Sequence, residues 1–309
     1  MIRKHKVLLA YLLVLAVFTT YVALDTFVIT RVYRGTGTRT SDREDQVRAG
    51  SSGNGTEEET MVPVITSNSY TDSNISIRID GYTVDGTEVY AAEVSLASPE
   101  YLKTALAQGL YGKNVTEETS QIAADNDAIL AINGDYYGAR EKGYVIKNGE
   151  LYRDTAVSGQ EDLVIYEDGS FGIIREDEIT ADELIADGAV NTLSFGPALV
   201  ESGRVTVGEN EEVARAMSSN PRTAIGIKAD GTYLFVVADG RTEESEGLSL
   251  YDLAEFMKEL GAVTAYNLDG GGSSTMVFNG NVINNPTGGR AGHGEGTERS
   301  VSDIVYIGC

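Results

Sequence analysis

The sequence predicts a mixed β-sheet core with packed helices, preceded by one N-terminal transmembrane helix and a flexible linker. Most apolar segments in the last three quarters of the chain are short and bounded by turn residues, as strands are. Fewer segments show the apolar spacing of a helix. The chain has 309 residues with 41% hydrophobic content, so it can bury a sizeable core.

The N-terminus combines a basic cluster with an apolar run. Arg3, Lys4 and Lys6 precede residues 7–24, a run long enough to span a bilayer. The basic cluster favours a single-pass protein of the cell membrane with its domain extracellular. A cleaved signal peptide is the alternative, but no small-x-small cleavage site follows the apolar core. We therefore expect a cytoplasmic tail and membrane anchor over residues 1–30.

The next segment, residues 31–72, is expected to be a flexible linker. Gly, Ser, Thr and mixed charges dominate residues 31–60, where large apolar residues are almost absent. Such a composition cannot bury enough apolar surface to fold. The folded domain is expected over residues 73–309.

The net charge of −23 excludes some partners and the cysteine count excludes some sites. So acidic a chain repels nucleic acid, and we expect no DNA or RNA partner. The single cysteine, Cys309, allows no intrachain disulfide and no cysteine-based metal site. His5 lies in the basic tail, which leaves His293 as the candidate for a histidine-dependent mechanism.

The first elements of the domain are a hairpin and two helices. Residues 75–79 alternate, residues 84–87 form a turn and residues 88–96 return, as in a hairpin. Pro99 opens a short helix. Asn114, with Glu117 three residues later, predicts a helix over residues 115–124.

A buried strand over residues 128–132 then delivers Asn133, Gly134 and Asp135. Polar residues at strand ends are where ligand sites of sheet proteins often lie. The alternative is a plain turn with aromatic packing from the two tyrosines that follow.

The middle of the chain is expected to be mostly scaffold. Turn residues predict hairpins at residues 147–150 and 167–170, and a helix is expected near residues 181–186. A strand then leads into residues 194–197, which form either a rigid turn lining the cleft or plain scaffold.

Arg222 precedes a hairpin formed by residues 224–228 and 233–238. Its guanidinium suits phosphate or carboxylate, and a structural ion pair is the alternative. The second strand ends at Asp239 and Arg241, again with an acidic residue at a strand terminus.

The last crossover places Asp269 at a strand end. Residues 250–260 show helical spacing with Ser249 as the cap, and the strand at residues 262–265 follows. Gly270, Gly271 and Gly272 come directly after Asp269. Consecutive N–H groups in such a loop can bind an anion, and a tight turn is the alternative.

A glycine-rich segment, residues 288–296, contains Arg290 and His293 and could close over a site. Arg299 follows it, and residues 304–307 form the last strand.

Six motifs, in this order, resemble the phosphodiester glycosidase family over roughly residues 73–308. They begin at Asn133, Ser194, Asn220, Asp239, Asp269 and Arg299. The resemblance implies an α+β domain around a β-sheet core and cleavage of a sugar-1-phosphodiester, a phosphorylated glycan substrate. Bacterial members are often labelled exopolysaccharide biosynthesis proteins, which implies a role in cell-envelope or exopolysaccharide glycan metabolism.

Such hydrolysis passes through an oxocarbenium-like state that a carboxylate stabilises or attacks. We expect the catalytic residues to be Asp269, Asp135 and Arg222, with Asp269 the first choice for acting at the sugar carbon. The expected substrate-binding residues are Asn133, Gly134, Asp239, Arg241, Gly270, Gly271, Gly272, Ser273, Ser274 and Arg299.

Three alternatives stay open at this point. The carboxylates also suit Ca²⁺ or Mg²⁺, so the metal requirement is unknown. A serine hydrolase would use Ser273 or Ser274 with His293, but no Gly-x-Ser-x-Gly elbow is present. The third is a non-catalytic module that binds glycan or phosphoglycan for envelope assembly.

Overall fold

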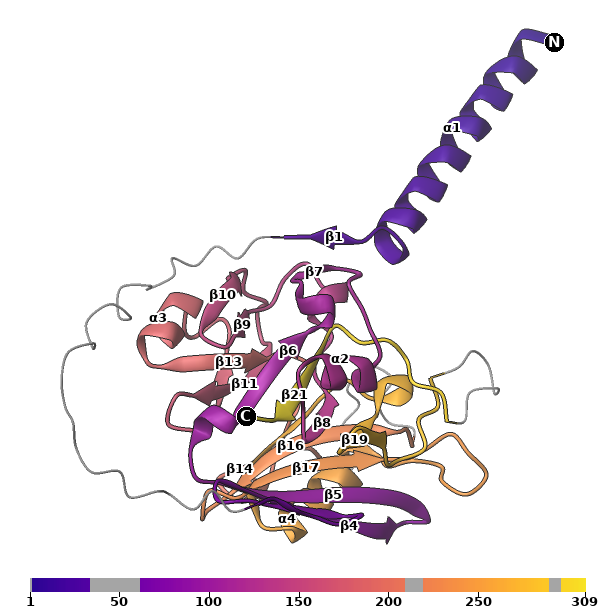
Figure 1. Ribbon diagram of the computed structural model, residues 1–309. Helices are drawn as coiled ribbons and strands as arrows, with labels where there is room; N and C mark the ends of the chain where they lie inside the picture. Colours follow the sequence, from indigo (N-terminus) through magenta and orange to yellow (C-terminus); the bar gives the residue numbers. More distant parts are fainter. Residues whose placement is uncertain (1, 34–61, 209–218, 289–295) are drawn as a thin grey trace.

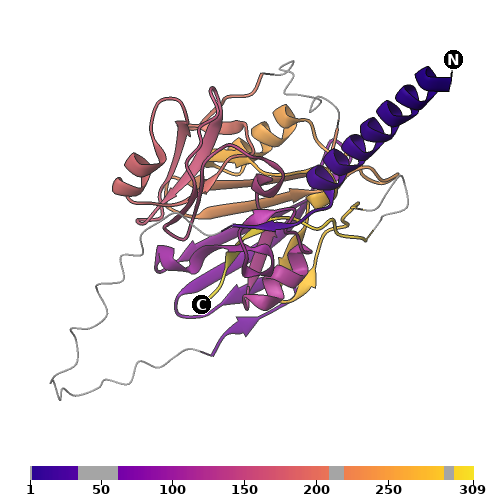
Figure 2. The same ribbon diagram turned by 90° about the horizontal axis from the view of Figure 1, so that it is seen from above.

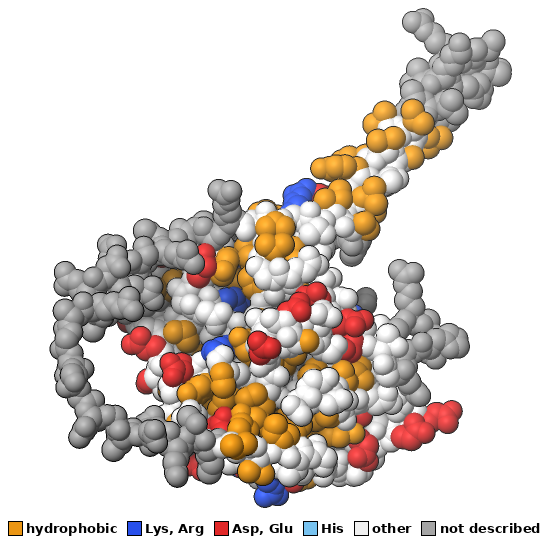
Figure 3. Space-filling view, in the orientation of Figure 1, with side chains coloured by type: hydrophobic (Ala, Val, Ile, Leu, Met, Phe, Trp, Pro, Cys, Tyr) orange, Lys and Arg blue, Asp and Glu red, His pale blue; other side chains and the backbone are white. Residues whose placement is uncertain are grey.

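The computed structural model describes residues 2–33, 62–208, 219–288 and 296–309 (Figure 1). Helix α1 (Ile2–Phe27) projects away from the domain in both ribbon views (Figure 1, Figure 2). Apolar side chains are exposed along it (Figure 3).

The predicted transmembrane anchor is not supported. Within the described residues, no helix is long and apolar enough to cross a membrane.

The largest sheet has nine strands in the order β15-β14-β18-β16-β17-β5-β4-β3-β2. The edge strand β2 (Val64–Ile65) and its neighbour β3 (Ser69–Thr71) come from the expected linker, so the sheet begins before residue 73. The other members are β4 (Ile75–Val84), β5 (Thr87–Leu96), β14 (Ala198–Glu201), β15 (Arg204–Val205), β16 (Arg222–Lys228), β17 (Tyr233–Ala238) and β18 (Ala262–Asn267).

A five-stranded sheet lies against the first, in the order β20-β19-β8-β21-β6. Its strands are β6 (Leu102–Leu106), β8 (Leu130–Asn133), β19 (Met276–Phe278), β20 (Asn281–Val282) and β21 (Asp303–Ile307). A three-stranded sheet is made by β11 (Glu161–Tyr166), β12 (Phe171–Arg175) and β13 (Ala189–Leu193). The hairpin β9 (Val145–Lys147) and β10 (Glu150–Arg153) and the pair β1 (Arg31–Val32) and β7 (Gly112–Lys113) complete the described strands, and every pairing between them is antiparallel.

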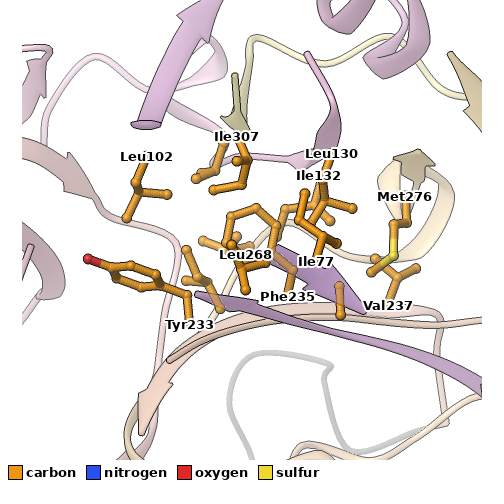
Figure 4. Close-up of a cluster of buried hydrophobic side chains, with 14 of the residues drawn as sticks. Ile77, Leu102, Leu130, Ile132, Tyr233, Phe235, Val237, Leu268, Met276 and Ile307 are labelled. Carbon is orange, nitrogen blue, oxygen red and sulfur yellow. The ribbon is translucent and has the colours of Figure 1, made fainter. Parts of the chain in front are cut away.

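The main core lies between the nine-stranded and five-stranded sheets, with β11 and β13 contributing. Figure 4 shows side chains of the two sheets meeting, among them Ile77, Phe235, Val237, Leu130, Ile132 and Ile307. Helix α4 (Leu250–Glu259) covers the other face of the nine-stranded sheet, and α2 (Thr119–Asp125) covers the other face of the five-stranded sheet. Helix α3 (Ala181–Ala186) packs near the three-stranded sheet. The α+β fold class is confirmed.

Local chemistry explains the elements that the sequence predicted. Asp85 and Gly86 both have positive φ, as the hairpin turn between β4 and β5 requires. Ser249 forms a capping box with Asp252 at the start of α4. The chain from β17 through α4 to β18 is the predicted crossover, because both strands pair antiparallel with β16, which lies between them.

One expectation from the sequence, the start of a helix, needs correction, and another concerns residues that the structure does not describe. Helix α2 begins at Thr119, later than predicted, because Glu117 instead bridges Val301 as an isolated β pair and its carboxylate accepts the N–H of Gln108 at 2.9 Å. In the segment expected to close over a site, Arg290 and His293 fall outside the described residues.

Candidate active site

The side chain of Asn133 joins the two large sheets at the end of β8. Its Nδ2 donates to the carbonyl oxygen of Asp269 at 2.6 Å. Its Oδ1 accepts from Thr223 Oγ1 on β16 at 2.8 Å and from the N–H of Thr275 at 3.2 Å. One buried amide therefore fixes where the loop after β18 lies relative to β8.

The two predicted aspartate motifs are in direct contact. The N–H of Asp269 donates to the carbonyl oxygen of Gly134 at 3.2 Å. Gly134 has no room for a side chain, because a Cβ there would lie 2.5 Å from Asp303 Oδ1. The structure thus brings the motif after β8 and the motif after β18 to one place.

The Asp269 carboxylate sits at the edge of a cavity. Its Oδ2 accepts from Ser273 Oγ at 2.7 Å and from Arg299 Nη2 at 2.6 Å. Arg299 Nε also donates to Ser273 Oγ at 2.8 Å. Burial raises the pKa of Asp269, while Arg299 and Ser273 act in the opposite direction. The cavity is about 310 Å³ and is lined by Asp269, Arg299, Tyr136, Asn114 and residues 300–302, among others.

The Asp135 carboxylate is held by the main chain. It accepts the N–H of Tyr137 and, at 3.0 Å, the N–H of Ser194. The N–H of Asp135 itself donates to Asp303 Oδ1 at 2.9 Å. Asp135 therefore fixes its own turn to the segment after β13, which brings Ser194 next to it.

Asp303 and Lys147 form a buried ion pair that the sequence did not predict as part of the site. Lys147 Nζ lies 2.6 Å from Asp303 Oδ2 and 3.1 Å from the carbonyl oxygen of Thr192. Burial raises the pKa of Asp303 to about 7, with Lys147 opposing the shift and Asp135 adding to it. In the sequence, Asp303 ends the motif that begins at Arg299 and Lys147 marks a hairpin turn, and nothing in either pattern predicts that the two side chains pair.

The glycine-rich loop uses several of its N–H groups internally. Gly271 donates to the carbonyl oxygen of Pro221 at 2.8 Å, Ser273 to that of Gly270 at 3.3 Å, and Ser274 to that of Gly271 at 3.1 Å. The glycines serve close packing: a Cβ at Gly270 would lie 2.9 Å from the oxygen of Pro221. The expected row of free N–H donors is therefore reduced to a part of the loop.

The remaining predicted residues lie on strands and loops that meet the same glycine-rich loop. Arg241 Nη2 would lie 2.9 Å from a Cβ at Gly271, and it donates to Asn220 Oδ1 at 3.0 Å. Arg222 Nε donates to the carbonyl oxygen of Leu248 at 2.9 Å. Burial and the nearby Arg241 lower the pKa of Arg222 to about 10.

Asp239 supports the segment after β20. Its Oδ1 accepts from Asn284 Nδ2 at 3.0 Å and from the N–H of Asn285 at 2.9 Å, and burial raises its pKa. Asn284 in turn donates to the carbonyl oxygen of Ser274 at 3.0 Å. Over the described ranges, no group of three or more His, Cys, Asp or Glu side chains could hold a metal ion.

Comparison with known proteins places this geometry in context. The sequence profile described as "Phosphodiester glycosidase" matches residues 126–308. An uncharacterized protein derived from the SPbeta prophage of Bacillus subtilis is 33% identical over 204 residues, covering 64% of this chain and 30% of that protein. The N-acetylglucosamine-1-phosphodiester alpha-N-acetylglucosaminidase of Mus musculus is 29% identical over 181 residues, covering 53% of this chain and 34% of that one. The chain thus spans about a third of the length of these relatives.

Two solved structures share the fold. The catalytic domain of the zebrafish N-acetylglucosamine-1-phosphodiester alpha-N-acetylglucosaminidase superposes with a TM-score of 0.59 at 23% identity, covering 75% of this chain and 82% of that one. A hypothetical protein from Synechocystis gives a TM-score of 0.54 at 17% identity, covering 76% of this chain and 62% of that one.

Proposed function

Because the chain belongs to the phosphodiester glycosidase family, we propose that it hydrolyses a sugar-1-phosphodiester, with Asp269 acting at the anomeric carbon. The observation that carries the proposal is the contact of Asp269, Ser273 and Arg299 at the edge of the cavity. A carboxylate beside a guanidinium suits a substrate with a sugar carbon next to a phosphate.

In the proposed reaction, the bond between the sugar C1 and the phosphodiester oxygen breaks and its electrons stay on the phosphate. The Asp269 carboxylate stabilises the positive charge that develops at C1. Water adds its hydroxyl to C1, and its proton passes to solvent. The leaving phosphomonoester is a stable anion, so the site needs positive charge near the phosphate more than a strong general acid. Arg299 supplies that charge.

The other predicted residues receive supporting roles. We propose that Asp135 is a positioning residue, since its carboxylate accepts two main-chain N–H groups. Asn133 and Gly134 hold the Asp269 loop through its main chain. Arg222 and Arg241 bring positive charge to the glycine-rich loop, which favours an anionic substrate in a chain of net charge −23. Asp239 acts on the same loop through Asn284, whose Nδ2 donates both to the Asp239 carboxylate and to the carbonyl oxygen of Ser274.

The test is to incubate the protein with the α and β anomers of a methyl sugar-1-phosphodiester. Hydrolysis is measured as the amount of methyl phosphate released. Wild-type protein should turn over one anomer, and Asp269→Asn should not. If wild type turns over neither anomer yet binds them, the chain is a non-catalytic glycan-binding module.

We also propose that the domain acts outside the cytoplasm on cell-envelope or exopolysaccharide glycan. The support is the basic cluster followed by an apolar run at residues 7–24, the order of features found in segments that direct export. Protease added to intact cells that express the full chain should digest the domain. Protection of the domain until the cells are lysed would contradict this location.

A further inference from the structure

A second cavity, of about 490 Å³, adjoins the Asp269 cavity and has an aromatic wall. The rings of Tyr111 and Tyr137 are stacked, with centroids 5.4 Å apart and planes at 19°. Tyr152 packs on Tyr111 at 4.9 Å and 38°. Neighbouring rings hold one another in place, so the wall is rigid. Rigid aromatic surfaces suit the apolar C–H faces of sugar rings.

The same cavity is basic in an acidic protein. Its lining contains Arg31, Lys113, Arg140 and Arg153, but Glu141 as its one acidic residue. On the face of the domain that Figure 3 shows, acidic side chains are numerous and basic ones are few. A local concentration of positive charge on a chain of net charge −23 attracts anions to this place.

Two of these cations are held by neutral acceptors. Arg140 Nη1 donates to the carbonyl oxygen of Ser194 at 2.6 Å. Arg153 donates to the carbonyl oxygens of Gly143 at 2.6 Å and Arg140 at 2.7 Å. Neither guanidinium forms an ion pair with any side chain of the described ranges. Both side chains are half-buried, so the fold orients them, and Arg153 Nη2 is itself buried.

The two cavities share their walls. Residues 111–116 and 136–141 contribute to both, and Gly138 lines both. The N–H of Asn114 donates to the carbonyl oxygen of Gly138 at 3.2 Å, which joins the two segments. Gly138 carries no side chain, and a Cβ there would lie 2.4 Å from Ser302 Oγ. The backbone at Gly138 therefore packs directly against Ser302, and the two cavities lie next to each other on either side of this residue.

We propose that the second cavity binds an anionic sugar unit on the leaving-group side of the scissile phosphodiester. Tyr152, supported by the buried Tyr111, meets the sugar ring, and the basic side chains hold its phosphate. The substrate is then a glycan chain that carries further phosphates, and not a small sugar-1-phosphodiester. This inference rests on the proposed function for the position of the scissile bond.

The test compares three probes: a trimer of hexoses joined by phosphodiester bridges, the neutral trisaccharide of the same hexoses, and the methyl hexose-1-phosphodiester. Wild type should prefer the trimer over the methyl compound in kcat/KM by about tenfold, the size expected for one aromatic and one charge contact. Calorimetric binding of the trimer and the neutral trisaccharide to wild type gives a readout that does not need turnover. The neutral compound should bind several-fold more weakly.

Lys113→Ala and Tyr152→Ala should each lower the preference for the trimer several-fold. Lys113 Nζ lies 3.0 Å from Glu141 Oε1, and the Glu141 side chain is exposed. Removing the Lys113 side chain therefore leaves no unpaired charge in the interior. The matched control is Lys228→Ala, which breaks an equivalent pair with Glu93 at 2.7 Å on the nine-stranded sheet and should keep the preference.

The outcomes separate the two proposals. Turnover of the methyl compound without preference for the trimer overturns the second site and keeps the proposed function. Trimer binding that both variants weaken, without turnover of any probe, keeps the site and overturns the function. If the neutral trisaccharide binds as tightly as the trimer, the proposal that this cavity selects an anionic ligand is wrong.

Discussion

Two ion pairs of equal length lie close together and differ in how far their side chains are exposed. Asp269 and Arg299 are 2.6 Å apart, with side chains 11% and 43% exposed. Asp303 and Lys147 are also 2.6 Å apart, with side chains 0% and 2% exposed. The first pair borders a cavity, whereas the second lies behind the turn that carries Asp135. Distance alone does not reveal the role of a charged pair.

The difference in exposure predicts a difference in what each pair does. The Arg299 guanidinium can exchange part of its contact with Asp269 for a substrate phosphate, because water and ligand reach it. Lys147 and Asp303 have no access to solvent, so their interaction is fixed once the chain folds. We expect changes at the first pair to alter catalysis and changes at the second to alter stability.

The largest expected effect is that of Asp269→Asn. The amide keeps the size of the carboxylate but cannot stabilise positive charge at the sugar carbon. We expect kcat to fall by at least about 10³-fold, as for loss of a direct catalytic group. The thermal unfolding midpoint should stay near that of wild type. Retention of most of the kcat would assign the chemistry to another residue.

Asp303→Asn tests the buried pair. The amide can still accept the N–H of Asp135, but Lys147 is left as a buried charge without its partner. We expect the free energy of unfolding to drop by about 3–5 kcal/mol, measured by urea denaturation. Adding Lys147→Met to this variant removes the unpaired charge and should restore part of the loss. A double variant less stable than Asp303→Asn would contradict this account.

Arg299→Gln tests the first pair through its pH dependence. Burial raises the pKa of Asp269 and Arg299 lowers it, so removing Arg299 raises that pKa further. The proposed reaction needs the ionised carboxylate, so activity should rise with pH through this pKa. The acidic limb of the kcat/KM profile should move to higher pH. An unmoved or lowered limb would show that Arg299 does not act on Asp269.

Lys228→Ala should have the smallest effect, and its change in the free energy of unfolding is the reference for the changes at the two site pairs. Lys228 Nζ lies 2.7 Å from Glu93 Oε1, nearly the length of the two site pairs, but at the surface of the nine-stranded sheet. An exposed pair contributes about 0–1 kcal/mol, so urea denaturation should show a change within that range. A loss as large as that of Asp303→Asn would remove burial as the explanation of the difference.

Much of the fold could be predicted because its signals are local. Asn148 and Gly149 both take positive φ in the turn between β9 and β10, and the residues themselves favour that geometry. The capping box of α4 lies within four residues. The start of α2 was missed because Glu117 pairs with Val301, far away in the sequence.

The site was predictable to the same extent. Asp269 and Asp135 stand out as acidic residues beside glycines at strand ends, and the structure brings their loops into contact. The pairing of Lys147 with Asp303 depends on how the β9–β10 hairpin lies relative to β21, which no local pattern encodes. The role of Ser194 in holding Asp135 has the same origin.

The missing side chain at Gly134 has a consequence for how this sequence can vary. Any Cβ at position 134 would fall 2.5 Å from Asp303 Oδ1, the same oxygen that receives the N–H of Asp135. The residues allowed at positions 134 and 303 therefore depend on each other. A single substitution at position 134 displaces the Asp303 carboxylate, which accepts the N–H of Asp135. A library randomised at position 134 alone and selected for folded protein should return glycine. A larger residue at position 134 should be tolerated only when position 303 carries a smaller side chain.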